Sequence, residues 1–327
     1  MGYGLLGVHV NATVGGLPEI MREWKPPLVV NLDHSDAWHD VKAASPQTIF
    51  VGRVLQALEP DFNDPSLDPI LAARNHCETI LPWAERMGQT YEFWQGVNEP
   101  VIHSGEAMQR YADFDAERLR VMGSHGFRCV VGSFSVGNPE LAYWQQFLPA
   151  LEAARQYGGA LALHEYAWPT LDHESQWYLL RHRKVYGGEP EHGWEGLPEH
   201  LQTLPLLITE CGLDGLIEQG SQPRGWRVLY GHDPDQYLQQ LLWYDAELQE
   251  DPYVIAAAIY CCSVADWTWK TYDIWPELAR TLAQEATPIY RPWPPYPPPP
   301  LPPDEEALWA EVMERLDRII LLLEEKI

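Results

Sequence analysis

No uninterrupted apolar run of about 18 residues, the length that a membrane-spanning helix needs, occurs in the 327-residue sequence. Its first residues, MGYGLLGVHVNATVGG, also lack the basic segment, apolar stretch and cleavage site of a secretory signal. We therefore expect no membrane partner and a cytoplasmic location, or an extracellular or virion-associated one if the native chain begins further upstream.

Basic residues are scarce as well. Lys and Arg number 22 against 47 Asp and Glu, so the formal net charge is −25, and no basic stripe interrupts the acidic excess. Because such a surface repels a phosphate backbone, we do not expect nucleic acid as a partner.

Cysteine is also rare, and its residues are odd in number with no pair in CxxC spacing. This pattern argues against a disulfide framework and against a zinc site. The histidines form no HExxH or comparable cluster, so we expect neither a metal nor another cofactor. Reduced, mostly buried thiols are predicted at Cys77, Cys129, Cys211, Cys261 and Cys262.

Amphipathic aromatic residues are abundant. The chain has 15 Trp and 16 Tyr but only 7 Phe. Trp and Tyr present an apolar face together with a polar edge, and sugars, with their CH faces and hydroxyl rims, are complementary to such surfaces. The skew favours a carbohydrate ligand, while most of these rings are expected to serve ordinary packing.

Short apolar runs recur along the chain, each followed by a stretch with helical spacing or by a polar loop. This alternation is typical of a parallel sheet wrapped by helices. Eight such runs in about 260 residues match a (β/α)8 or TIM barrel, and we predict an α/β fold of that class. The predicted strands are residues 4–10, 27–33, 48–54, 91–97, 127–133, 160–166, 205–211 and 253–261.

Polar side chains lie mainly where these runs end, which is the end of a TIM barrel that carries the active site. The long connection at 167–204 is predicted to form a lid or a wall of the cleft. The segment 215–235 is predicted either to form a second wall or to pack on the barrel as a surface loop. The polar residues at the strand ends are His9, Asp33, Arg53, Asn98, Glu99, His164, Glu165, Glu210 and Asp266.

The composition changes abruptly after Ala286, where TPIYRPWPPYPPPPLPP predicts an extended polyproline spacer. We therefore divide the chain into a barrel at 1–287, a Pro-rich linker at 288–303 and a C-terminal amphipathic helix at 304–327. Apolar residues of this helix repeat every three or four positions, as in a coiled-coil seam. The helix is predicted to associate with copies of itself in a homo-oligomer, and the alternative is docking on its own barrel.

Two glutamates end strands of the predicted barrel. Glu99 follows the fourth run in GVNEP, where Pro100 stops the strand, and Glu210 ends the seventh run in PLLITECG. Hydrolysis of a glycosidic bond with retention needs two carboxyl groups roughly 5–5.5 Å apart, one to protonate the leaving oxygen and one to attack the anomeric carbon. These two residues are the candidates for that pair.

The Asn-Glu-Pro after the fourth strand and the Ile-Thr-Glu-Cys-Gly after the seventh resemble motifs of clan A of the glycoside hydrolases, which includes many cellulases, mannanases, β-galactosidases and β-xylosidases. The resemblance spans about residues 1–287. It implies a retaining glycoside hydrolase acting on the β-linkages of a glycoside, oligosaccharide or polysaccharide, with Glu99 as acid/base and Glu210 as nucleophile. It also implies that Asn98 binds the 2-hydroxyl of the sugar.

Further contacts follow from the same resemblance. His164 and Tyr166 correspond to the histidine and aromatic residue that the clan often carries near the end of strand six, with the Tyr hydroxyl near the nucleophile. A Trp after strand eight often forms the floor under the sugar, and Trp267 and Trp269 are the candidates here. Since neighbouring strand residues point to opposite sides, Glu165 and the His164/Tyr166 pair cannot all face the barrel axis.

An arginine near a nucleophilic carboxylate keeps it ionised. Arg53, at the end of strand three, is the predicted partner of Glu210, although the clan more often places such an arginine on strand two. Polar residues occupy the ends of strands one and two instead. Those predicted to bind sugar hydroxyls are His9, Asp33 and His34.

Two other classes of function compete with hydrolysis. A sugar-binding or structural barrel without turnover, displayed in several copies by the tail, stays open as the alternative. A barrel with enolate or aldol chemistry needs a strand-end lysine or a metal cluster, and the predicted strands offer neither. The identity of the sugar, and terminal or internal cleavage, are not determined by these patterns.

Overall fold

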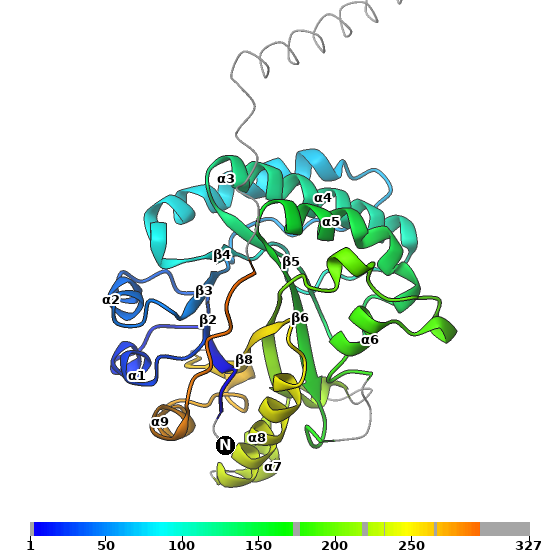
Figure 1. The fold of residues 1–327 in the computed structure, drawn as a ribbon. Helices are drawn as coiled ribbons and strands as arrows, with labels where there is room; N and C mark the ends of the chain where they lie inside the picture. The colour runs from blue at the N-terminus through cyan, green and yellow to red at the C-terminus, as the bar shows by residue number, and fades with distance from the viewer. Residues whose placement is uncertain (1–2, 173–176, 218–221, 232, 265–266, 295–327) are drawn as a thin grey trace, which may run out of the picture.

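The structure, a computed structural model, describes residues 3–172, 177–217, 222–231, 233–264 and 267–294. Eight parallel strands close into a barrel in which each pairs with the next and β8 pairs with β1 (Figure 1). All eight predicted strands are confirmed, and the fold is a (β/α)8 barrel. The strands are β1 Leu6–Val10, β2 Leu28–Asn31, β3 Ile49–Gly52, β4 Phe93–Trp94, β5 Arg128–Phe134, β6 Ala160–Ala167, β7 Leu206–Leu213 and β8 Val254–Cys262.

Helices surround the barrel, with α3, α4 and α5 packed side by side (Figure 1). The two longest begin at side-chain caps, since Asp68 accepts hydrogen bonds from backbone N–H groups of α3 and Ser104 from one of α4. Among the described helices, none combines the length and apolarity needed to cross a bilayer. The helices are α1 Leu17–Trp24, α2 Ala37–Ala44, α3 Pro69–Met87, α4 Gly105–Ser124, α5 Trp144–Gln156, α6 His182–Gly187, α7 Trp226–Tyr230, α8 Asp235–Gln249 and α9 Glu277–Glu285.

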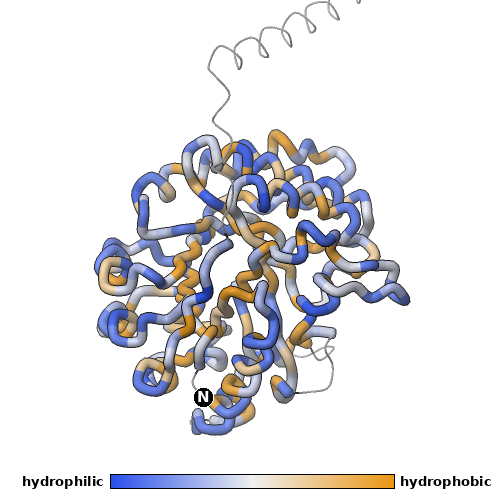
Figure 2. The backbone as a smooth tube through the Cα atoms, viewed as in Figure 1, coloured by the Kyte–Doolittle hydropathy of each residue, from blue (hydrophilic) through white to orange (hydrophobic). Residues whose placement is uncertain are grey.

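Apolar residues concentrate on the strands and on the helix sides that face them (Figure 2). Successive side chains of a strand point to opposite faces, so each strand contributes to two layers. In β2, Val29 packs toward the helices, whereas Leu28 and Val30 fill the barrel interior. The interior is therefore a packed core, and a ligand can enter only beyond the strand ends.

Strand β4, which leads to Glu99, is only two residues long and is held by a buried ion pair. Arg118 of α4 pairs with Asp115 at 2.8 Å. Its guanidinium also donates to the carbonyl oxygens of Trp94 and Val130 at 3.2 and 2.5 Å. These bonds tie β4 to β5 and fix the starting point of the segment that carries Glu99.

Residues 287–294 run across the N-terminal end of the barrel, away from the strand ends that carry the polar residues (Figure 1). The ring of Trp293 lies 4.7 Å from that of Phe93, the first residue of β4, and packs on the interior core. Arg291 donates to the carbonyl oxygen of Val254, the first residue of β8, at 2.6 Å. This segment therefore closes the bottom of the barrel.

The described part of the predicted linker, residues 288–294, thus packs against the barrel rather than projecting from it. The rest of the linker and the helix at 304–327 lie outside the described residues. The domain division and the homo-oligomer formed through that helix remain predictions.

Replacing Trp293 with alanine is expected to lower the free energy of unfolding by about 2–4 kcal/mol, because the change opens the base of the interior core. Thermal and denaturant unfolding would measure this loss. Trp267→Ala is the matched control, since Trp267 is 86% exposed and its removal should cost less than about 0.5 kcal/mol. Equal stabilities of the two variants would contradict the role assigned to Trp293.

Candidate active site

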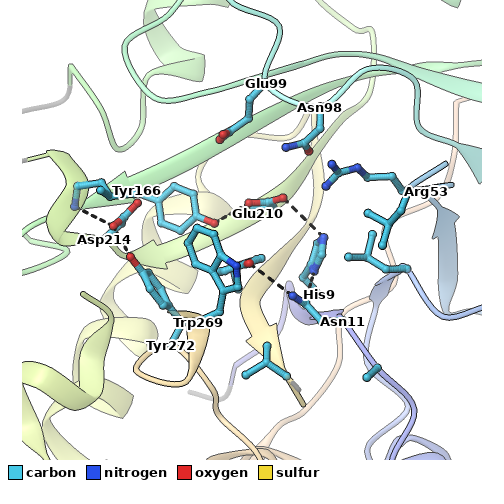
Figure 3. A pocket seen from close by; sticks show the side chains of 16 residues that line it. His9, Asn11, Arg53, Asn98, Glu99, Tyr166, Glu210, Asp214, Trp269 and Tyr272 are labelled. Carbon is cyan, nitrogen blue, oxygen red and sulfur yellow. Dashed lines mark hydrogen bonds and ion pairs between the residues drawn. The ribbon is translucent and has the colours of Figure 1, made fainter. Parts of the chain in front are cut away.

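A pocket of about 470 Å³ lies where the C-terminal ends of the strands meet. Figure 3 shows carboxyl groups, amides, imidazole and aromatic rings converging on it. A concave space with a few convergent polar groups is typical of a small-molecule site. The lining residues are His9, Asn11, Ala12, Leu32, Arg53, Leu55, Asn98, Glu99, Tyr166, Glu210, Asp214, Leu216, Tyr260, Val264, Trp269 and Tyr272.

Glu210 reaches this pocket because β7 contains a bulge. The pairing of β7 with β6 skips Thr209, so that Glu210 pairs with His164. Directly paired residues in a sheet share a face. Regular alternation from Leu207, which packs in the barrel interior, would have directed Thr209 inward and Glu210 toward the helices.

Polar groups surround the Glu210 carboxylate on both oxygens. The Tyr166 hydroxyl donates to Oε2 at 2.7 Å, His164 Nδ1 lies 3.6 Å from Oε2, and His9 Nε2 lies 3.6 Å from Oε1. Burial by itself raises the pKa of Glu210, but the charges of His164 and Arg53 and the Tyr166 hydrogen bond lower it below its usual value. Glu210 is therefore ionised at neutral pH.

Glu99 faces Glu210 in Figure 3. Its backbone is left-handed, with φ 48°, and its N–H donates to the carbonyl oxygen of Ser133 at 2.9 Å. This conformation costs a non-glycine residue on the order of 1 kcal/mol, and it is a common feature of functional sites. A carboxylate oxygen of Glu99, one of Glu210 and a ring nitrogen of His164 all lie within 4.8 Å of one another.

His164 is buried between these two carboxyl groups. Its Nδ1 lies 2.8 Å from Glu99 Oε1. Burial lowers the pKa of His164, but the charges of Glu210 and Glu99 and the hydrogen bond to Glu99 outweigh it and raise the pKa above its usual value. The ring therefore stays protonated to higher pH than a free histidine, and Nδ1–H is assigned as the donor to Glu99 Oε1.

The same three residues form a group whose geometry could hold a metal ion. His164 cannot offer Nδ1 to a metal while that nitrogen donates to Glu99. A second such group, Glu189, Glu191 and His192, does not line the pocket. That the chemistry uses no metal stays a prediction.

Arg53 and Asn98 both line the pocket. Arg53 Nη2 lies 3.7 Å from Glu59 Oε1. The charge of Arg53 contributes to the lowered pKa of Glu210. Asn98 Oδ1 accepts a hydrogen bond from Gln95 at 3.0 Å, which orients the amide and leaves its NH2 group as the part able to donate to a ligand.

His9 lies in the pocket as a neutral imidazole. Burial is the main cause that lowers the pKa of His9 to about 4. Its Nδ1 lies 2.9 Å from Asn11 Oδ1, an acceptor, so the proton is assigned to Nδ1 and Nε2 is left as an acceptor. A ligand hydroxyl could donate to that nitrogen.

An aromatic wall lies below Glu210. Tyr260, near the end of β8, has ring centroids of Trp269 and Tyr272 at 5.8 and 5.7 Å. Of the two tryptophans predicted as a floor, Trp269 lines the pocket and Trp267 does not, because its side chain is exposed to solvent. Neither Tyr260 nor Tyr272 was predicted from the sequence as a pocket residue. The only available signal for Tyr260 was a hydroxyl-bearing ring at the end of an apolar strand.

Asp214, just after β7, is a third carboxyl group of the pocket that the sequence analysis missed. Its Oδ1 accepts from the Tyr272 hydroxyl at 2.5 Å and from the Leu216 N–H at 2.8 Å. Burial raises the pKa of Asp214, and the charges of Glu99 and Glu210 raise it further. Asn11 also lines the pocket and was not predicted. Asp214 and Asn11 each lie in a loop beyond the end of their strand.

Asp33 and His34, predicted to bind sugar hydroxyls, are not among the lining residues. Asp33 Oδ2 instead accepts from the backbone N–H of Thr13 at 2.7 Å. His34 is buried with Nδ1 3.3 Å from the Tyr91 hydroxyl, and burial is the main cause that lowers its pKa to about 4. Both side chains therefore bond to Thr13 and Tyr91 and stabilise the loop after β2.

The long connection after β6 does not form a wall of the pocket in its described part. It contains α6 and two short 3-10 turns, Pro190–His192 and Glu199–Leu201. From the segment 215–235, the described residues contribute one side chain to the lining, Leu216. The long connection packs on the barrel through Leu171, Leu179, Leu180, Val185, Tyr186, Trp194, Leu197 and Leu201.

All five cysteines are free and buried, as predicted. Burial raises the pKa of Cys211, beside Glu210, well above its usual value. A thiol in that state is a poor nucleophile.

No family model matches the chain, and no curated protein matches it. Solved structures do match. Glycoside hydrolases are among them. A β-glucuronidase from Ruminococcus gnavus shares 10% identity at a TM-score of 0.49, over 86% of this chain and 49% of that one. A GH2 β-galacturonidase from Eisenbergiella tayi shares 11% at 0.47, over 87% and 50%.

A family 39 glycoside hydrolase from Bacteroides cellulosilyticus shares 12% identity at a TM-score of 0.49, over 86% of this chain and 64% of that one. This chain spans about half the length of the first two matches. Similarity at these levels concerns the backbone only. The chemistry of the pocket has to be argued from its own residues.

Proposed function

We propose that the protein is a retaining glycoside hydrolase that cleaves β-glycosidic bonds by double displacement. The observation that carries the proposal is the close approach of Glu99 and Glu210, which bring carboxylate oxygens within 4.8 Å of each other. Retaining enzymes hold their carboxyl groups about 5–5.5 Å apart, whereas inverting enzymes separate them by about 6.5–9.5 Å to admit a water. The spacing supports direct attack by a carboxylate.

In the first step Glu210 attacks the anomeric carbon while Glu99, as the acid, protonates the departing glycosidic oxygen. The products are a glycosyl ester on Glu210 and a free alcohol. In the second step Glu99 removes a proton from water, which attacks the same carbon and releases Glu210. Two inversions give net retention, and no co-reactant other than water is consumed.

The surroundings of the two carboxyl groups suit these separate roles. Glu210 is buried, with its side chain 9% exposed, and its lowered pKa keeps it ionised for attack. The Glu99 side chain is 39% exposed, which leaves it accessible to the leaving group and to the incoming water. The hydrogen bond between His164 Nδ1 and Glu99 Oε1 fixes the orientation of that carboxyl group.

The primary test is a panel of aryl β-glycosides hydrolysed by the wild type and by Glu210→Gln. Activity in the wild type alone would establish the reaction class and name the sugar. NMR of the first-formed product should show the β-anomer, and an α-anomer would overturn the retaining mechanism. If no glycoside of the panel is hydrolysed, the non-catalytic sugar-binding barrel is favoured, and binding to a glycan array would then test it.

The charge of the pocket predicts a preference for neutral sugars. Among the described lining residues, Glu99, Glu210 and Asp214 are accompanied by one arginine, Arg53, which is itself close to Glu59. Since juxtaposed like charges cost several kcal/mol, we expect kcat/KM for aryl β-glucosides or β-galactosides to exceed that for the matching uronides by at least about 10-fold. Asp214→Asn should narrow this ratio, and a faster uronide would contradict the prediction.

The pH profile provides a further prediction. Because Tyr166 donates to Glu210 and lowers the pKa of that carboxyl group, Tyr166→Phe should raise it. Activity requires ionised Glu210, so the acidic limb of kcat/KM should move to higher pH in the variant. Tyr272→Phe is the control, because it removes a bond to Asp214 and should leave the position of the limb unchanged. Identical limbs in Tyr166→Phe and the wild type would contradict the assignment.

A further inference from the structure

A buried glutamate lies behind the site and takes no part in the steps above. Glu165 stands on β6 between His164 and Tyr166, is fully buried, and points to the opposite face. The neighbours on each side contact the proposed acid/base and nucleophile, at 2.8 Å from His164 to Glu99 and 2.7 Å from Tyr166 to Glu210. Whatever holds Glu165 in place therefore also sets the direction of these two side chains.

Each oxygen of Glu165 accepts two hydrogen bonds. Oε1 accepts from the backbone N–H and the Nδ1 of His182, at 3.0 and 2.7 Å. Oε2 accepts from the backbone N–H of Leu180 at 3.0 Å and from the hydroxyl of Tyr244 on α8 at 2.7 Å. The donors come from the β6–β7 connection and from α8, so the carboxylate joins three separate segments.

The network continues away from the barrel. His182 Nε2 lies 3.0 Å from Asp251 Oδ2, and Arg183 donates to the same oxygen at 2.8 Å. Arg183 also pairs with Glu247 of α8 at 2.8 Å. The start of α6 is thereby anchored to the C-terminal end of α8, and it presents its N–H groups to Glu165 in a fixed direction.

Stability alone does not account for a carboxylate in this layer. Glu165 occupies the face of β6 on which Leu161 and Leu163 pack against the helices. Replacing a buried ion pair by apolar side chains of similar size is often neutral or stabilising, because desolvation cancels much of the attraction. Hydrogen bonds differ from apolar contacts in being directional, and they fix the rotation of a strand as well as its depth.

We infer that Glu165 is a positioning residue, and that the long β6–β7 connection serves to hold it so that His164 and Tyr166 face Glu99 and Glu210. The bulge in β7 makes such a device necessary, because skipping Thr209 interrupts the ladder beside the segment that must be placed. This inference rests on the proposed function for its kinetic readout. The β6–β7 connection would thus hold Glu165 on the helix-facing side of β6 and would not act as a wall of the pocket.

Glu165→Gln tests the inference with little change in shape. Its amide has one acceptor oxygen where the carboxylate has two, so one pair of donors faces an NH2 group. We expect a loss of about 10- to 100-fold in kcat with a smaller change in KM, since displacements near 1 Å at a reacting group cost about that much. The acidic limb of the pH profile should also move to higher pH as the Tyr166 contact to Glu210 loosens.

If Glu165→Gln does not fold, two milder variants still test the inference. Tyr244→Phe removes one donor to Glu165, whereas Tyr186→Phe removes a buried hydroxyl that donates to the Leu204 carbonyl at 2.7 Å in the same connection. Both should lower the melting temperature to a similar degree. Only Tyr244→Phe should lower kcat and shift the pH profile, and wild-type kinetics in a folded Tyr244→Phe variant would overturn the inference.

Failure of the proposed function has a separate signature. If no glycoside is hydrolysed, the imidazole 15N chemical shifts of His164, assigned with a His164→Gln variant, provide a readout that does not depend on turnover. Tyr244→Phe should shift them because the contact to Glu99 moves, while Tyr186→Phe should not. Unchanged His164 shifts in both variants would overturn the inference without reference to catalysis.

Discussion

Glu210→Gln is expected to abolish turnover of every glycoside that the wild type hydrolyses. The amide cannot form the glycosyl ester, and it also loses the charge that His164 and Tyr166 are arranged to stabilise. Removing a catalytic nucleophile costs on the order of 10⁶-fold in kcat in well-studied hydrolases, so the residual rate should fall below detection. Steady-state assays at high enzyme concentration, with circular dichroism to check folding, would measure the effect.

A rescue experiment distinguishes a lost nucleophile from general damage. In Glu210→Ala, azide can enter the space left by the carboxylate and attack the anomeric carbon directly, which would give the α-glycosyl azide from a β-glycoside. Glu250→Gln, at an exposed position beyond α8, is the matched control and should keep the wild-type rate. Retained hydrolysis in Glu210→Gln would remove this residue from the nucleophile role.

Glu99→Ala is expected to slow the hydrolysis of substrates with poor leaving groups much more than that of substrates with good ones. Loss of a general acid costs roughly 10²- to 10⁴-fold when the departing alcohol needs a proton. An aryl glycoside with a strongly acidic phenol needs little protonation, so its first step should be nearly unaffected and the glycosyl ester should accumulate. A burst of phenol followed by slow turnover would be seen by stopped-flow absorbance.

Azide gives the opposite stereochemical result in this variant. It attacks the accumulated ester on Glu210 without needing a base, which should accelerate turnover and yield the β-glycosyl azide. Opposite azide anomers from Glu99→Ala and Glu210→Ala would show that the two glutamates act on opposite faces of the anomeric carbon. Equal losses for good and poor leaving groups in Glu99→Ala would contradict its role as the acid.

Local sequence patterns predicted the framework well. Apolar runs of strand length, repeated eight times with helical stretches between them, leave few arrangements other than a parallel barrel, and the barrel is present. The same logic placed Glu99, Glu210, Tyr166 and Arg53 at one end, because the carboxyl ends of parallel strands share an edge. Alternation along β6 also predicted that Glu165 and its two neighbours face opposite ways.

Loop residues were predicted less well. Asp33, His34 and Trp267 have suitable chemistry near strand ends, yet none lines the pocket. Asn11, Asp214 and Tyr272 do line it, although each lies beyond a strand in a segment without periodicity. The direction of such side chains depends on which partner lies within reach, as Thr13 does for Asp33, and spacing along the chain carries no information about it.

The sequence by itself thus determined the eight strands, the end of the barrel at which polar residues gather, and the presence there of Glu99 and Glu210, the proposed catalytic pair. Only the tertiary structure decided that Glu210 faces the pocket, since that depends on a bulge at Thr209 against the regular alternation of β7. It also decided that Glu99 turns through a left-handed backbone toward Glu210, and that residues 288–294 close the barrel base. Strand periodicity is a local property that each segment carries alone, whereas bulges, left-handed residues and loop contacts form only where neighbouring segments compensate their cost.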